Sequence, residues 1–146
     1  MPTLLQIIFR LALSAGLCGI IGLEREYRHK PAGLRTNILV GMGSTLVILM
    51  SLYATGQDNG DILRLASGVI TGIGFLGAGV IIRGQGGQND EDMVHGITTA
   101  ATIWIVAVIG LAVGLGFYFG AITAAVIALA VLYGLNSERI RNKISK

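Results

Sequence analysis

Five long apolar runs dominate the chain, and polar or charged clusters separate most of them. The runs cover residues 4–23, 34–54, 65–82, 97–114 and 117–135. A helix needs about 20 residues to cross the hydrocarbon core of a bilayer, because each residue adds only about 1.5 Å. Each run comes close to or exceeds that length, so the pattern predicts an all-α fold of five transmembrane helices.

The last two runs form one uncharged stretch of 39 residues, 97–135, with the sequence GLGFYFG near its middle. The stretch is about twice as long as one spanning helix needs, and its glycines favour a tight turn. We therefore predict a hairpin of two helices, with Phe117, Tyr118 and Phe119 at the level of the lipid headgroups. A four-helix alternative would make this stretch one long tilted helix.

Glycine is the second feature of the pattern, with 22 residues in the chain. The third run is the richest, with Gly68, Gly72, Gly74, Gly77 and Gly79. Glycine weakens helices, so two re-entrant halves are an alternative to one continuous third helix. Small residues also recur at every fourth position, as Gly68 and Gly72 in the third run, Gly110 and Gly114 in the fourth, and Gly116, Gly120, Ala124 and Ala128 in the fifth. Such stripes predict close helix packing, within one chain or between copies.

Composition and charge agree with a polytopic membrane protein. Apolar residues make up 53% of the chain, charged residues 13%, and the mean hydropathy is +0.72. Nine of the eleven basic residues fall in the first connection, the third connection and the segment after the fifth run. Basic residues near span ends stay in the cytoplasm, so the amino terminus is expected outside and the carboxyl terminus inside. The net charge of +3 lies at span ends and gives no basis for nucleic-acid binding.

This arrangement predicts one membrane domain over residues 1–136 and a short basic cytoplasmic tail over residues 137–146. Polar groups gather on the predicted cytoplasmic side of that domain. The first run is followed by Glu24, Arg25 and Glu26, with Arg28 and Lys30 placed for i,i+4 pairs if the helix continues toward Pro31. The other candidates on this side are Arg35, Thr36, Asn37, Arg83, Thr98 and Thr99. Charged and polar side chains at a membrane boundary are costly unless they are paired, so we expect these residues to converge on one site.

Four segments together resemble a known family. They are GLERE at 22–26, AGLRTNILV at 32–40, SGVITGIGFLGAGVIIR at 67–83 and HGITTAATIW at 95–104. In this order they are similar to the membrane domain of the MgtC/SapB family. The resemblance implies a bacterial inner-membrane protein linked to growth under magnesium limitation and, in some pathogens, to survival in macrophages. It further implies an influence on membrane energetics through the F-type ATP synthase. Longer members carry a soluble carboxy-terminal domain that this chain is expected to lack, and His95 stands where the family often has a basic residue.

Three kinds of function follow as hypotheses. The first is a regulatory membrane protein that senses an ion or contacts a partner, and the second is a transporter for an ion or small solute. The transport path would be marked by Glu24, Glu26, Arg35, Asn37 and Arg10. The alternative for Arg10, inside the first span, is that it snorkels outward or pairs with Asp58 or Asp61. An enzyme is not expected, because no nucleophile and base pair or metal-binding motif stands out. We expect no cofactor, a magnesium link from the family resemblance alone, and a homo-oligomer of which a dimer is the simplest form.

Overall fold

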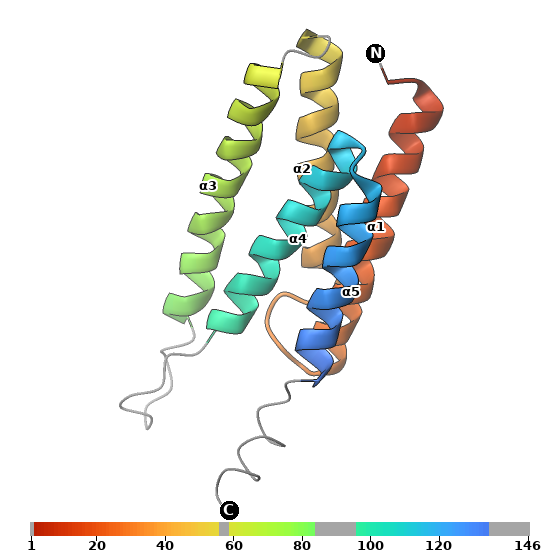
Figure 1. The fold of residues 1–146 in the computed structure, drawn as a ribbon. Helices are drawn as coiled ribbons and strands as arrows, with labels where there is room; N and C mark the ends of the chain where they lie inside the picture. Colours follow the sequence, from red (N-terminus) through yellow and green to blue (C-terminus); the bar gives the residue numbers. More distant parts are fainter. Residues whose placement is uncertain (1, 56–58, 84–95, 135–146) are drawn as a thin grey trace, which may run out of the picture.

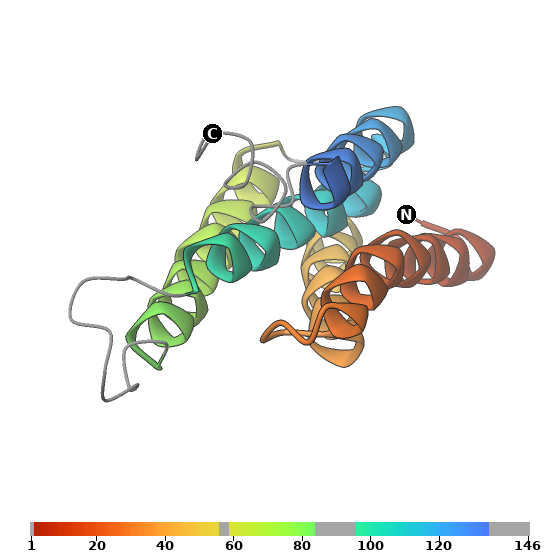
Figure 2. The same cartoon turned by 90° about the horizontal axis from the view of Figure 1, so that it is seen from below.

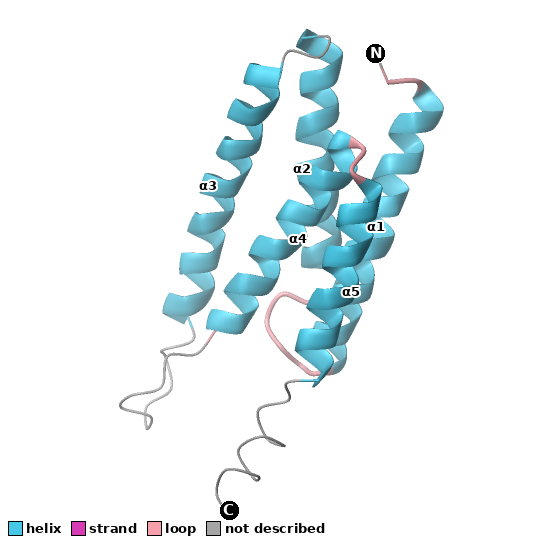
Figure 3. Cartoon of the chain, in the orientation of Figure 1, coloured by secondary structure: helices cyan, strands magenta, loops and turns pink. Residues whose placement is uncertain are grey.

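The computed structural model describes residues 2–55, 59–83 and 96–134, and these form a bundle of five α-helices (Figure 1). The helices are α1 (Leu4–Tyr27), α2 (Leu34–Thr55), α3 (Asn59–Arg83), α4 (Ile97–Leu115) and α5 (Tyr118–Gly134). Within the described ranges the remaining backbone is loop or turn, and no strand occurs (Figure 3). The predicted all-α membrane fold is confirmed.

Four of the five helices are long and apolar enough to cross a membrane, and α5 is a shorter apolar helix. Helix α3 is continuous from Asn59 to Arg83, so the alternative with re-entrant halves is wrong. The four-helix alternative is also wrong, because the long uncharged stretch bends between Leu115 and Tyr118. Gly116 caps α4 there in the left-handed region, at φ +85°, and therefore lies in the turn and not on α5 as its spacing predicted.

The helices alternate in direction along the bundle. Figure 1 shows the amino-terminal end of α1 at the top and the carboxyl-terminal ends of α1, α3 and α5 at the bottom. The α1–α2 connection and the beginning of α4 therefore share the lower end with the end of α5. We call this the polar end, because the candidate polar residues of α1, α2 and α4 lie there. The predicted tail 137–146 and His95 lie outside the described residues.

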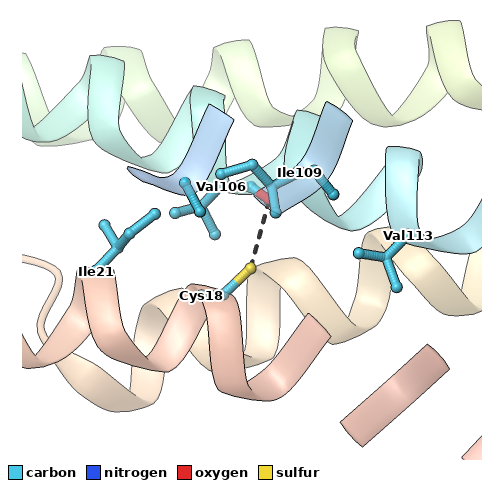
Figure 4. Packing of buried hydrophobic residues seen from close by; sticks show 7 residues of the cluster. Cys18, Ile21, Val106, Ile109 and Val113 are labelled. Carbon is cyan, nitrogen blue, oxygen red and sulfur yellow. Dashed lines mark hydrogen bonds between the residues drawn. The ribbon is translucent and has the colours of Figure 1, made fainter. Parts of the chain in front are cut away.

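Helix α4 lies at the centre of the bundle and contacts all four other helices. Its main apolar contacts are with α1 and α5. In this core Cys18 and Ile21 of α1 and Val106, Ile109 and Val113 of α4 are fully buried (Figure 4). The Cys18 thiol points at the carbonyl oxygen of Val106, 3.7 Å from it, so it acts as a packed side chain in this core. Many large apolar side chains on the outer faces are exposed, as expected for helices that face lipid.

Helices α2 and α4 cross closely at glycines. A Cβ atom at Gly110 would overlap the carbonyl oxygen of Gly41, and one at Gly114 would lie 2.7 Å from the Cβ of Ile48. The Thr45 hydroxyl donates to the carbonyl oxygen of Gly110 at 2.8 Å, across the same crossing. Small residues let two backbones approach this closely in a membrane, where polar hydrogen bonds between helices add to packing.

The glycines of α3 behave differently from those of α4. A Cβ atom at Gly68, Gly72, Gly74 or Gly79 would meet nothing within 4 Å, and one at Gly77 would touch only Ala100 in ordinary contact. Gly120 in α5 lies against the ring of Phe117. The predicted stripe on α3 therefore makes almost no helix contact within the described part of one chain.

Arg10 has a partner that its position in sequence does not reveal. Its guanidinium donates to the carbonyl oxygen of Gly114 at 2.7 Å and to the hydroxyl of Tyr118 at 3.0 Å. The carbonyl groups in the last turn of a helix carry partial negative charge, so a cation there is favourable. Arg10 thus connects α1 to the α4–α5 turn. The expected pairing with Asp58 or Asp61 involves side chains outside the described ones.

Candidate functional site

The polar end brings together residues from three helices. Helix α1 contributes Glu24 and Arg25 from its last turn, and Arg28 caps its carboxyl end. Helix α2 contributes Asn37, and α4 contributes Thr99. We call these five residues the polar cluster. They reach one place because α1 ends, and α2 and α4 begin, at the same end of the bundle (Figure 1).

Glu24 lies between two arginines. Its carboxylate is 2.5 Å from Nε of Arg28 and 3.8 Å from Nη1 of Arg25. The side chain of Glu24 is only 10% exposed, that of Arg25 is 6% exposed and that of Arg28 is 23% exposed. These contacts are ion pairs by distance, although neither carboxylate oxygen makes a well-directed hydrogen bond. The cluster therefore carries one negative and two positive charges in a place largely screened from solvent.

Arg25 connects α1 to α4. Its Nη2 donates to the Thr99 hydroxyl at 3.2 Å, in the first turn of α4. The α4 amino terminus follows Gly96, which adopts φ +94° and provides no side-chain cap. A guanidinium beside this end adds to the positive end of the helix dipole instead of compensating it. Among the described residues, Glu24 is thus the carboxylate whose negative charge offsets the Arg25 guanidinium beside the α4 amino terminus.

Asn37 is fully buried where α1 and α2 meet. Its side-chain amide donates to the carbonyl oxygens of Ala32 and Gly33, at 2.6 and 2.8 Å, and so holds the α1–α2 connection against α2. The backbone of α2 can approach α1 because residue 22 is glycine, where a Cβ atom would lie 2.8 Å from the Cα of Leu34. The acceptor oxygen of Asn37 has no hydrogen-bond partner among the described residues.

The other candidates from the sequence lie outside the cluster. Glu26 is exposed, and its carboxylate accepts from the backbone N–H of Leu34 at 2.8 Å, so the expected Glu26–Lys30 pair is replaced by a cap on α2. Helix α1 ends at Tyr27, which leaves Lys30 outside the helix and removes the i,i+4 geometry. Arg35, Thr36 and Thr98 are exposed. Arg83 is the last residue of α3, and its side chain lies outside the described ones.

The Glu26 cap leads to a first prediction. We expect Glu26→Ala to destabilise the purified chain by about 1 kcal/mol, because the first turn of α2 loses an acceptor for an otherwise unpaired N–H. Thermal unfolding in detergent, followed by circular dichroism, measures the change. Glu26→Gln keeps an acceptor oxygen and should lose less than half as much. Equal losses for both variants would show that the carboxylate charge matters and the hydrogen bond does not.

The described residues hold no group of three or more His, Cys, Asp and Glu side chains that could bind a metal ion. The arrangement instead joins α1 to α4 through a paired carboxylate, a buried guanidinium and a threonine hydroxyl. Together with the apolar outer faces, it defines the chain as a polytopic helical membrane protein with a charged cluster at one end of its bundle.

The chain belongs to the MgtC family, whose family model matches residues 11–139. It is 42% identical over 134 residues to "Putative magnesium transporter YhiD" of Escherichia coli strain K12, covering 87% of this chain and 59% of the relative. It is also 42% identical over 128 residues to "Protein MgtC" of Salmonella typhimurium strain 14028s, covering 88% of this chain and 50% of the relative. The chain thus spans about half the length of these relatives. No solved structure matches it.

Proposed function

We propose that this chain is a regulatory inner-membrane protein of the MgtC type that supports growth when magnesium is scarce. The observation that carries the proposal is the closed pairing of the polar cluster, in which Glu24 contacts two arginines and Arg25 reaches across to Thr99. The ion pairs lie within α1 and its carboxyl-terminal cap, and the hydrogen bond from Arg25 to Thr99 couples the position of α1 to that of α4. Such coupling suits a regulatory protein whose partner recognises the relative positions of these helices.

The second candidate is a transporter for an ion or small solute. It is favoured by the name of the relative YhiD and by the acceptor oxygen of Asn37, which is buried and has no described partner. Magnesium takes six oxygen ligands in near-octahedral geometry and usually keeps several waters. Glu24 and Glu26 do not converge on such a site, because Glu26 turns toward the backbone of Leu34. Transport would therefore need ligands beyond these two carboxylates.

Glu24 and Glu26 provide a matched pair of variants for the growth test. We expect Glu24→Gln to slow growth strongly at low magnesium and to leave growth at high magnesium unchanged, because the two arginines of the cluster lose their counter-charge. Glu26→Gln makes the same chemical change two residues away, outside the cluster, and should grow like wild type. Immunoblots of membrane fractions check that both variants accumulate. Wild-type growth of Glu24→Gln at low magnesium would contradict a role for the cluster.

Ion flux separates the two candidates. The purified chain in liposomes that contain a magnesium-sensitive dye should show no flux above empty liposomes if its role is regulatory. Magnesium flux that Glu24→Gln abolishes and Glu26→Gln preserves would favour the transporter.

Orientation and partners belong to the same proposal. Arg28 and Lys30 of the α1–α2 connection, with Arg25 and Arg35 beside it, lie at the polar end, and by the positive-inside rule they support a cytoplasmic location for that end and an outside amino terminus. We propose as partners a second copy of the chain and the F-type ATP synthase. The open glycines of α3 support the first, since a neighbouring backbone could approach there. Affinity purification from gently solubilised membranes tests both, with differently tagged copies for the oligomer. Recovery of neither partner would contradict this part of the proposal.

A further inference from the structure

Two cations at the polar end have no described ion-pair partner. Lys30 lies in the α1–α2 connection and Arg35 in the first turn of α2, and both side chains are exposed. The nearby carboxylates are engaged elsewhere, because Glu24 contacts Arg28 and Glu26 accepts from the Leu34 backbone. This rim of the bundle therefore presents positive charge that the described chain does not neutralise.

Arg35 stands at one end of an exposed stripe on α2. Helical spacing places Leu39, Leu46, Met50 and Tyr53 on the same face as Arg35, and these four side chains are 69%, 45%, 61% and 65% exposed. Tyr53 lies 18 residue steps after Arg35, which corresponds to roughly 27 Å along a helix axis. That length is close to the roughly 30 Å of a bilayer's hydrocarbon core. The stripe thus offers an apolar track of membrane thickness with a guanidinium at one boundary and a tyrosine at the other.

The surroundings of Arg35 are those of a lipid interface. Figure 2, seen from below, shows the α1–α2 connection at the edge of the bundle, where α1 ends and α2 begins. Tyr27, at the end of α1, is 87% exposed at the same end. Exposed tyrosines are typical of the headgroup level of a membrane. A phospholipid whose acyl chains lie along the stripe would bring its phosphate to the level of Arg35.

We propose that Lys30 and Arg35 form a headgroup site for an anionic phospholipid, with its acyl chains against the exposed stripe of α2. A guanidinium can bind two phosphate oxygens at once, and the lysine ammonium adds a second positive charge. The headgroup of a zwitterionic lipid brings its own cation to this site, so it is bound less tightly. Basic residues beside a membrane are attracted to anionic lipids in this way.

Lipid retention by the purified chain tests the site. Native mass spectrometry of the chain in detergent, titrated with phosphatidylglycerol or phosphatidylcholine, gives both affinities. We expect phosphatidylglycerol to bind about tenfold more tightly to the wild type. Arg35→Gln and Lys30→Gln should each weaken phosphatidylglycerol binding about fivefold and leave phosphatidylcholine binding unchanged. Both side chains are exposed, so the variants should keep the helical spectrum of the wild type.

Arg64 provides the matched control, because it is also an exposed arginine but lies in the first turns of α3, at the opposite end of the bundle. Arg64→Gln changes the net charge as Arg35→Gln does and should leave phosphatidylglycerol affinity unchanged. An equal loss in both variants would overturn the proposal, because only net charge would then matter. Equal affinities of the wild type for the two lipids would overturn it as well. Displacement of phosphatidylglycerol by an equal concentration of inorganic phosphate would also do so, since it would indicate a phosphate-ion site that needs no acyl chain.

Discussion

Gly110→Ala is expected to destabilise the chain by about 3 kcal/mol or more and to lower its yield in the membrane. The new methyl group would overlap the carbonyl oxygen of Gly41 and lie 2.9 Å from the Cβ of Ser44. Backbone atoms of α2 cannot rotate away as a side chain does, so the two helices must separate. Overpacking of a close-packed interior costs about 1–3 kcal/mol even where side chains can adjust. Separation would also weaken the Thr45–Gly110 hydrogen bond.

Gly43→Ala is the matched control for this prediction. Gly43 lies on α2 near the same crossing, but a Cβ atom there would meet nothing within 4 Å. Alanine favours a helix over glycine by up to about 1 kcal/mol, so this variant should be as stable as the wild type or slightly more stable. Thermal unfolding of both variants in the same detergent gives the comparison. Similar unfolding temperatures for Gly110→Ala and Gly43→Ala would show that the α2–α4 crossing does not depend on close backbone contact.

The fold was predictable because its signals are local. Apolar runs of spanning length gave the helices, and the glycines near residue 116 gave the turn between α4 and α5. The end of α1 was less well predicted, since a helix that stopped before Pro31 could end at any of several residues. It ends at Tyr27, which excludes Lys30 from an i,i+4 pair and frees Glu26 to cap α2.

The site was predictable in part. The sequence indicated that Glu24, Arg25, Asn37 and Thr99 lie at one end of the bundle, because alternating helices bring them there. It could not show which side chains face inward, since this depends on the rotation of each helix about its own axis. Asn37 is fully buried, whereas Arg35, two residues earlier, is exposed. The contact between Arg10 and the end of α4 was missed for the same reason, although a lone arginine in an apolar run was a signal that it needed a partner.

Arg25→Met is expected to destabilise the chain by about 3 kcal/mol or more, and it is the second large effect. Arg25 is 5% exposed, and its removal leaves the Thr99 hydroxyl without its donor and Glu24 with only Arg28. Breaking a buried ion pair by removing one partner typically costs about 3–5 kcal/mol, because the remaining charge stays desolvated. Methionine keeps much of the side-chain volume, so the loss reports the guanidinium and not a cavity. Unfolding by heat or denaturant in detergent measures it.

A double-mutant cycle separates the Arg25–Thr99 bond from the rest of this loss. Thr99→Val removes the hydroxyl with little change in shape and should cost about 1 kcal/mol by itself. If the two side chains hold α1 to α4, the double variant should be more stable than the sum of the single losses predicts, by about 1–2 kcal/mol. Arg28→Met is the control, because Arg28 also pairs with Glu24. Its coupling to Thr99→Val should be less than about 0.5 kcal/mol, since the described contacts include no hydrogen bond between Arg28 and Thr99. Additive losses for Arg25→Met and Thr99→Val would mean that the buried guanidinium serves Glu24 alone, and α1 and α4 would then be coupled only through their apolar core.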